Sequence, residues 1–266
     1  MEGGDPPCGR TGASPYNSQN LIVIITKNYY TLANPKEGLL MLEGHIYKTF
    51  DLELKELKEK LLYEGGLVEK AIDNAIKALL ERDSDLAKKV IEEDVLINDL
   101  EVEIDEFCLK LLALRQPAAR DLRFITTAIK INYDLERIGD MAVNICERVE
   151  ELNQEPQLKP YIDLPKMTET VRTMLTESLD AFVREDVSLA LKVTKDDAQV
   201  DQLLDQMFRE LLTYMMQDMR TISRATRLLF ISKYMERMAD HSVNIAELVI
   251  FMVEGKIIRH LKEPGE

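Results

Sequence analysis

The ten-residue stretch ERIGDMAVNI, residues 136–145, decides the fold, because it returns as ERMADHSVNI at residues 236–245. Glu, Arg, Asp, Val, Asn and Ile hold the same places in both copies. A second pair of phrases, RDSDLAKKVIEED at residues 82–94 and EDVSLALKVTKDD at residues 185–197, repeats at nearly the same offset. A period this long indicates a duplicated domain rather than an array of short repeats.

The composition is typical of a helical protein, with 45% hydrophobic residues and only 11 Gly and 9 Pro among 266 residues. A formal net charge of −14 argues against a nucleic-acid surface and favours a cation or a basic protein surface as partner. Three cysteines are too few for a disulfide framework, and no apolar run is long enough to span a membrane. We therefore expect a cytoplasmic protein that is not inserted into a membrane.

Apolar residues recur with helical spacing from residue 46 onward. Asp83 and Asp186 stand where the second helix of each copy would have its N-cap. The expected helices cover residues 46–82, 84–114, 119–150, 165–184, 187–217 and 220–255. We predict an all-α fold of two tandem antiparallel three-helix bundles related by internal duplication. The repeats occupy residues 46–152 and 165–262, with a proline-containing linker at residues 153–164.

The first 45 residues differ from the rest of the chain. They contain a stretch rich in Gly, Pro, Ser and Asn and show no helical periodicity. We predict that residues 1–45 form a disordered, dispensable extension. Met41 is then a candidate for the functional start of translation.

The repeated stretch places one apolar stripe on each of its two helices, as expected for the core face. At about 100° per residue, the stripe comprises Leu135, Ile138, Ala142 and Ile145 in the first copy and Met235, Met238, Ser242 and Ile245 in the second.

A second stripe, nearly opposite the apolar one, carries carboxylates and amides. Like charges four residues apart weaken an isolated helix, so such a ladder indicates that a cation lies on it. The second helix of each copy supplies further oxygen atoms at the edge of its own apolar stripe. Oxygen ligands without Cys or His select hard cations such as magnesium, calcium, manganese or oxidised iron. The candidate metal ligands are Asp94, Asn98, Glu136, Asp140 and Asn144 in the first copy and Asp197, Asp201, Glu236, Asp240 and Asn244 in the second.

Two alternatives stay open. The carboxylates are also compatible with a solvated surface without metal, paired with Arg120, Arg137, Arg220 and Arg237. A metal-dependent helical-bundle enzyme or a metal-storage protein is the other alternative, although the Glu-x-x-His pairs of di-iron bundles are missing. We expect no enzyme, because neither a phosphate-binding glycine loop nor a nucleophile–base pair is recognisable. His241, whose counterpart in the first copy is Met141, is expected to be packed or solvated.

The duplicated bundles, the acidic motif of each copy, the linker phrase EPQLKP and the phrases DLEVEID and LLTYMMQDMR together resemble the PhoU family. These are accessory and regulatory proteins of bacterial phosphate transport, and the resemblance covers residues 44–261. The family's acidic motif matches Glu136 and Asp140 in the first copy and Glu236 and Asp240 in the second.

The resemblance implies a cytoplasmic regulator of phosphate homeostasis that restrains both the phosphate regulon and phosphate uptake. It implies contacts with subunits of the phosphate ABC transporter and with a phosphate-sensing histidine kinase, which would recruit the protein to the inner membrane. It also implies a homodimer, and clusters of iron, zinc, manganese or magnesium on the acidic motifs.

Overall fold

The computed structural model describes residues 35–256, with side chains from residue 49. The chain divides into two compact units, residues 1–51 and 52–266. Of the first unit, the structure describes the start of one long helix, and the contacts and sites described below belong to the second unit. The helices are α2 (Pro35–Glu81), α3 (Ser84–Glu93), α4 (Val95–Arg115), α5 (Ala119–Asn153), α6 (Asp163–Arg184), α7 (Val187–Gln217), the 3-10 helix η1 (Met219–Thr221) and α8 (Ile222–Glu254).

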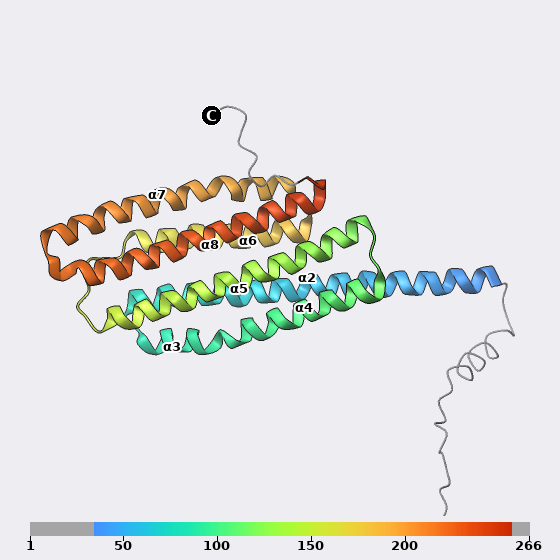
Figure 1. The fold of residues 1–266 in the computed structure, drawn as a ribbon, viewed down its shortest axis with the longest axis horizontal. Helices are drawn as coiled ribbons and strands as arrows, with labels where there is room; N and C mark the ends of the chain where they lie inside the picture. The colour runs from blue at the N-terminus through green and yellow to red at the C-terminus, as the bar shows by residue number, and fades with distance from the viewer. Residues whose placement is uncertain (1–34, 257–266) are drawn as a thin grey trace, which may run out of the picture. The chain divides into compact units, whose positions relative to one another are not determined.

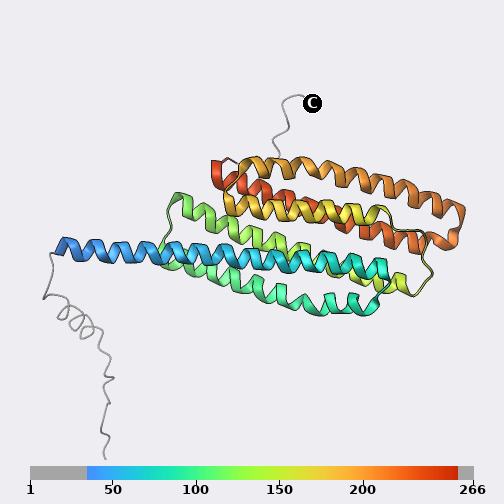
Figure 2. The same cartoon turned by 180° about the vertical axis from the view of Figure 1, so that it is seen from behind.

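The described residues contain helices and no strands, and the predicted all-α fold of duplicated three-helix bundles is confirmed. One group consists of α2, of α3 followed by α4, and of α5, and the other consists of α6, α7 and α8 (Figure 1). The two groups lie side by side, and Figure 2 shows the same grouping from behind. Helices α5 and α8, which carry the repeated stretch, pack against each other where the groups meet.

Helix α2 begins at Pro35, well before the predicted start at residue 46. The prediction of disorder is therefore wrong for residues 35–45, and for residues 1–34 it lies outside the described residues. Proline suits the first position of a helix, where its missing N–H is not needed. Single glycines such as Gly38 and Gly44 cost a helix only about 1 kcal/mol each, so they did not end it.

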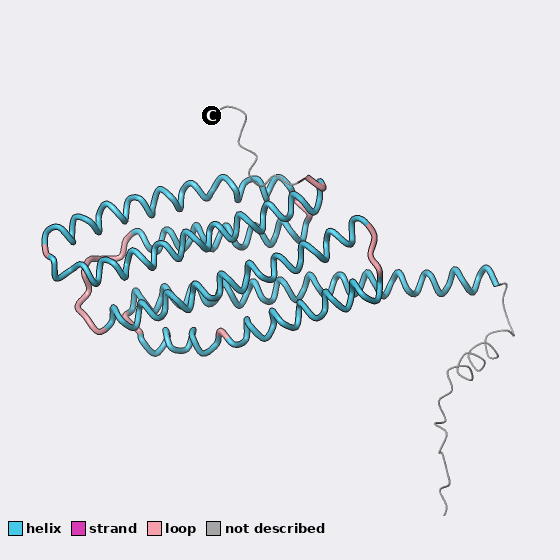
Figure 3. Tube along the Cα trace, in the orientation of Figure 1, coloured by secondary structure: helices cyan, strands magenta, loops and turns pink. Residues whose placement is uncertain are grey.

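The predicted helix at residues 84–114 is divided at Asp94 into α3 and α4, and Figure 3 shows the short break. The N–H groups of Ile97 and Asn98 both donate to the Asp94 carbonyl oxygen, at 2.9 and 3.1 Å, so the chain tightens there without leaving the helical region. The corresponding helix of the second repeat, α7, runs unbroken. Neither Gly nor Pro marks the break, which is why the sequence pattern missed it.

Asp83 and Asp186 cap their helices as predicted. The Asp83 side chain accepts from the N–H groups of Asp85 and Leu86, and Asp186 accepts equivalently in the second repeat. The chain between α5 and α6 is non-helical at residues 154–162, and Pro165 lies in the first turn of α6, where proline is tolerated.

The predicted apolar stripes form the core of each repeat. All eight of their side chains are buried, namely Leu135, Ile138, Met235, Met238, Ala142, Ile145, Ser242 and Ile245. No helix in the described part of the chain is both long and apolar enough to cross a bilayer.

Gly65 allows α2 and α6 to approach closely. A Cβ atom added to Gly65 would lie 2.3 Å from Cδ1 of Leu179, whereas one added to Gly66 would meet nothing within 4 Å. A side chain at position 65 would therefore require the end of the Leu179 side chain to move.

Candidate functional site

In the first repeat, the break between α3 and α4 places Asp94 beside the acidic motif of α5. Burial raises the pKa of Asp94, and the nearby charge of Asp140 raises it further. The amide of Asn98 donates to Oδ2 of Asp94 at 3.0 Å, which opposes the rise. Asp94 and Asp140, on different helices, thus lie near enough for the charge of Asp140 to act on Asp94.

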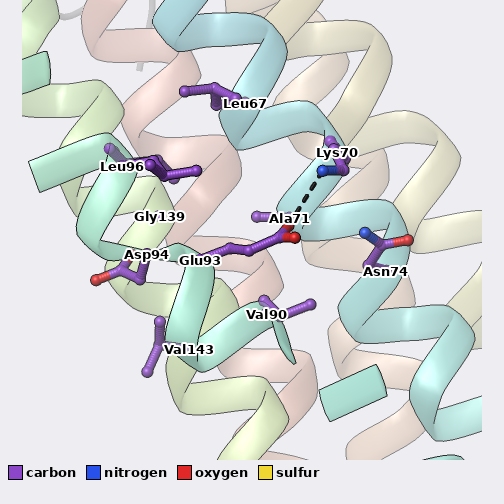
Figure 4. Close-up of a pocket in the computed structure, with 11 residues that line it drawn as sticks. Leu67, Lys70, Ala71, Asn74, Val90, Glu93, Asp94, Leu96, Gly139 and Val143 are labelled. Carbon is purple, nitrogen blue, oxygen red and sulfur yellow. Dashed lines mark hydrogen bonds and ion pairs between the residues drawn. The ribbon is translucent and has the colours of Figure 1, made fainter. Parts of the chain in front are cut away.

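Gly139 permits this approach. A Cβ atom at Gly139 would lie 3.2 Å from Cδ1 of Ile97 and 3.5 Å from Oδ1 of Asp94. A small, mostly apolar cavity lies here between α2, the α3–α4 break and α5 (Figure 4). In that view Glu93 extends to Lys70, whose Nζ is 3.1 Å from Oε2, while Asp94 points the other way. The break thus separates Glu93, which is paired with Lys70, from Asp94, which faces the acidic motif of α5.

The motif carboxylates of α5 are half-buried. The stripe geometry alone had suggested that they lie fully on the surface. Burial raises the pKa of Glu136, and Asp140 contributes to the rise. Arg137 lies beside both, with Nη1 2.9 Å from Oδ2 of Asp140 and Nε 3.4 Å from Oε2 of Glu136. Oε2 of Glu136 is nonetheless buried without a hydrogen-bond donor.

The second repeat brings four carboxylates together. Burial raises the pKa of Asp197 to about 6, and the charges of Asp201, Asp240 and Glu236 add to the shift. Burial and Glu236 also raise the pKa of Asp240. Oδ1 of Asp197 and Oε2 of Glu236 are buried and accept no hydrogen bond. Repulsion among these groups is only partly offset by Lys233, which pairs with Glu236.

The two predicted asparagines of the motif helices are placed differently from the carboxylates. Asn144 donates to the backbone carbonyl of Asp140 on its own helix, at 2.8 Å. Asn244 lines a cavity of about 520 Å³ that also contacts Asp134 and His241. Asn144 therefore uses its amide N–H in its own helix, and Asn244 faces the region where the repeats meet.

The donor set fits a hard cation in its chemistry. It consists of carboxylate and amide oxygens, three of which are buried without a donor, and its carboxylates repel one another. The side chains do not converge into a preformed centre, because in the described part of the chain no three His, Cys, Asp or Glu side chains are placed to hold a metal ion. A cation would therefore have to draw the carboxylates together as it binds.

The alternative of a surface neutralised by arginines is met only in part. Arg137 pairs with the first motif, but Arg120 pairs with Glu185 and Arg220 with Asp218. Arg120, at the start of α5, instead meets Glu185 at the C-terminal end of α6, and Arg220 in η1 meets the nearby Asp218.

The structure describes the side chains of two of the three cysteines, Cys108 and Cys146, and of one of the three histidines, His241. Cys108 and Cys146 are fully buried, and burial raises the pKa of each thiol to about 12, so neither is a nucleophile at neutral pH. Nδ1 of His241 lies 2.7 Å from Oδ1 of the buried Asp134. His241 is packed, as expected, and its partner comes from the other repeat.

Sequence reasoning missed a group of polar residues in the core of the first repeat. Glu64 is fully buried, and its pKa is raised to about 9 by burial and by the charges of Glu101, Glu136 and Asp105. Asn132 is buried beside Glu101 and Asp105, to which its amide donates. Aligning the repeats at the offset of the Asp83 and Asp186 caps would have revealed Glu64, because that position holds a methionine in the second repeat.

The fold and the paired acidic motifs define a class of protein, the duplicated three-helix bundle with an acidic motif in each half. A family model described as the PhoU domain matches residues 63–149 and again residues 164–249. The chain belongs to the PhoU family.

Relatives and solved structures agree with this assignment. The chain is 45% identical over 221 residues to the "Phosphate-specific transport system accessory protein PhoU homolog" of Pseudomonas putida, covering 83% of this chain and 86% of the relative. It is 39% identical over 222 residues to the accessory protein PhoU of Escherichia coli K12, covering 84% and 92%. The crystal structure of PhoU from Pseudomonas aeruginosa superposes with a TM-score of 0.75 at 45% identity, covering 78% of this chain and all of the other. PhoU from Streptococcus pneumoniae, a phosphate transport system regulatory protein, gives 0.74 at 34% identity, covering 79% and 99%.

Proposed function

We propose that this chain is an accessory protein of a phosphate transport system and regulates phosphate uptake. The observation that carries the proposal is the match of both three-helix repeats to the PhoU domain, at residues 63–149 and 164–249. The relatives that share these repeats over 83% and 84% of the chain are named as accessory proteins of the phosphate-specific transport system.

The regulation is negative and works by contact. When phosphate is abundant, the protein lowers phosphate uptake and expression of the phosphate regulon, through the phosphate ABC transporter and a phosphate-sensing histidine kinase. Adjacent helical bundles offer faces on which partner helices can dock. The net charge of −14 favours basic patches on those partners and makes the association sensitive to salt. The protein acts in the cytoplasm as a homodimer, and its partners bring it to the inner membrane.

The acidic motifs serve this role as cation sites. Asp94, Glu136 and Asp140 would hold a hard cation in the first repeat, and four carboxylates would do so in the second, namely Asp197, Asp201, Glu236 and Asp240. Support comes from the raised pKa values of Asp94, Glu136, Asp197 and Asp240, and from buried oxygens of Glu136, Asp197 and Glu236 that accept no hydrogen bond. A bound cation would supply positive charge that removes the repulsion among the carboxylates and fixes the second helix of each repeat against the third.

Deletion of the gene tests the regulatory role. In phosphate-rich medium, a reporter of the phosphate regulon should rise on deletion and return to its repressed level when the wild-type gene is restored. A copy that carries Asp85→Ala, an exposed acidic residue at the opposite end of α3 from Asp94, should restore repression as well. If the reporter stayed repressed after deletion, the proposed function would be wrong, whatever the fold.

A further inference from the structure

The outer face of α4 carries a row of exposed apolar side chains. Val95, Val102 and Leu109 are 53%, 54% and 62% exposed. Each is seven residues from the next, close to two helical turns, so the three project from one side of the helix over about 20 Å. The buried residues Ile97 and Ile104 lie on the opposite side. Helix α4 lies at an edge of the first group of helices in Figure 1 and, seen from behind, in Figure 2.

The fold does not require this apolar row. With the repeats aligned on their helix caps, the counterparts of the row on α7 are Ala198, Asp205 and Leu212, so the central position holds an aspartate. The alignment is supported by the core, because buried positions of α4 match the buried positions of this part of α7, namely Val200, Met207 and Leu211. The second repeat thus builds the same bundle with a charged residue where the first exposes a valine. Single exposed apolar residues are ordinary, but an aligned row marks an interaction site.

Acidic residues accompany the apolar row. Asp99 and Glu106 project from the same side of α4 between the apolar residues, and both are exposed. Lys110, near the C-terminal end of the row, is the basic residue on this side. The counterparts of Asp99 and Glu106 on α7 are Gln202 and Arg209, so the negative charge is also particular to the first repeat. An occupant of this face therefore meets apolar side chains interleaved with carboxylates.

The charges of this face select its occupant. A second copy of the chain packed on the same row would bring the same carboxylates against each other, and an anionic bilayer would be repelled as well. An apolar row at seven-residue spacing matches the apolar stripe of another helix. Asp99 and Glu106 require Lys or Arg beside that stripe. The chemistry therefore favours an amphipathic helix with basic flanks from a different protein.

We propose that the outer face of α4, formed by Val95, Val102, Leu109, Asp99 and Glu106, docks one basic amphipathic helix of a partner protein. The apolar row supplies the affinity, and the carboxylates set the orientation and reject acidic partners. The second repeat has no equivalent surface, so each chain binds one such helix. The proposal rests on the regulation by contact proposed above, and it names the side of the molecule where that contact forms.

The first test measures binding of the full-length protein to a fluorescent synthetic helix with a leucine stripe flanked by lysines. Val102→Asp installs the residue of the second repeat and adds a negative charge. Charge attraction alone would then tighten binding, whereas docking on the apolar row predicts a Kd about tenfold higher or more. Leu109→Gln, which leaves the charge unchanged, should weaken binding as well. The control Leu191→Asp makes the same charge change at a 43% exposed position of α7 and should not weaken it. Circular dichroism checks that each variant is folded.

The second test uses the phosphate-regulon reporter in the deletion strain. A copy with Val102→Asp should fail to restore repression, whereas a copy with Leu191→Asp should restore it.

Three results would overturn the docking surface. They are undiminished peptide binding by Val102→Asp and Leu109→Gln, no binding by the wild type, and full repression by the Val102→Asp copy. Loss of self-association in a folded Val102→Asp protein, measured by sedimentation, would also overturn it by assigning the face to a contact between copies. A reporter that stayed repressed on deletion would instead contradict the proposed function and leave the peptide measurements unchanged, so the two failures are distinguishable.

Discussion

Nδ1 of His241 on α8 lies 2.7 Å from Oδ1 of Asp134 on α5, so a largely buried polar pair joins the two repeats. The counterparts of these residues in the opposite repeats are Met141 and Tyr234. The contact between His241 of α8 and Asp134 of α5 therefore has no equivalent between the corresponding positions of the opposite repeats. Removing one member leaves the other buried without its partner.

His241→Leu should lower the free energy of unfolding by about 2–3 kcal/mol, because Asp134 loses its partner while it stays buried. The double variant Asp134→Leu/His241→Leu should recover part of that loss, since no unpaired polar group remains. Urea unfolding monitored by circular dichroism measures both. Equal losses in the single and double variants would mean that the pair contributes only through packing.

Glu64→Met should change how stability depends on pH in ion-free protein. The pKa of Glu64 is about 9 in the folded chain and 4.5 as a free side chain. The folded state therefore holds the proton more tightly, and the wild type loses stability as pH rises from about 5 to about 9. The slope approaches about 1.4 kcal/mol per pH unit. Glu64→Met should remove this loss, as urea unfolding at several pH values in chelator would show. The same slope in both proteins would contradict it.

The pKa of Asp197, raised to about 6, predicts a pH dependence of cation binding in the second repeat. A carboxylate must lose its proton to bind a cation. Mn²⁺ affinity of this repeat should therefore fall by about tenfold for each pH unit below the pKa of Asp197. Isothermal titration at pH 7 and pH 5 measures it. Asp197→Asn should bind weakly at both pH values, and an undiminished pH dependence in that variant would assign the proton elsewhere.

Asp140→Ala combined with Asp240→Ala should lower the amount of bound metal without a loss of helicity, because both side chains lie outside the apolar cores. Metal analysis of the purified protein and circular dichroism give the two measurements. Asp85→Ala combined with Glu169→Ala, which also removes two negative charges but at exposed positions of α3 and α6, is the control. Unchanged metal content in the double variant would favour the solvated surface.

Gly65→Ala and Gly66→Ala should have opposite effects. The first places a Cβ atom 2.3 Å from Leu179 and should cost about 1–3 kcal/mol through overpacking. The second meets nothing within 4 Å and should stabilise the helix by about 0.5–1 kcal/mol. Thermal melting of the two variants decides the matter, and similar shifts in both would show that α6 can move aside.

Features set by local pattern were predictable from the sequence. Asp83 and Asp186 are residues that can cap a helix, and the apolar residues after each recur with helical spacing, so both helix starts could be predicted. The apolar stripe that begins at Leu135 follows from the helical period alone. The break at Asp94 was not predictable, because its backbone angles remain helical and no Gly or Pro precedes it. Which acids are half-buried depends on how neighbouring helices pack, and helical periodicity alone does not contain that information.

The candidate site follows the same division. Periodicity placed Glu136 and Asp140 on one face, and alignment of the copies supplied Glu236 and Asp240. The burial of Glu136 and the turning of Asn144 towards its own backbone depend on tertiary contacts and rotamers. Similarity between the repeats does not reveal Glu64, because the repeats differ at this position, where the second has Met167.

The close crossing at Gly65 has a consequence for the history of the chain. The position equivalent to Gly65 in the second repeat is Thr168, a larger residue with a branched side chain. A chain assembled from two second repeats would bring that branch against a leucine, and the end of the leucine side chain would have to shift. The missing side chain at residue 65 therefore distinguishes the two copies at the point where they cross, although their helices correspond.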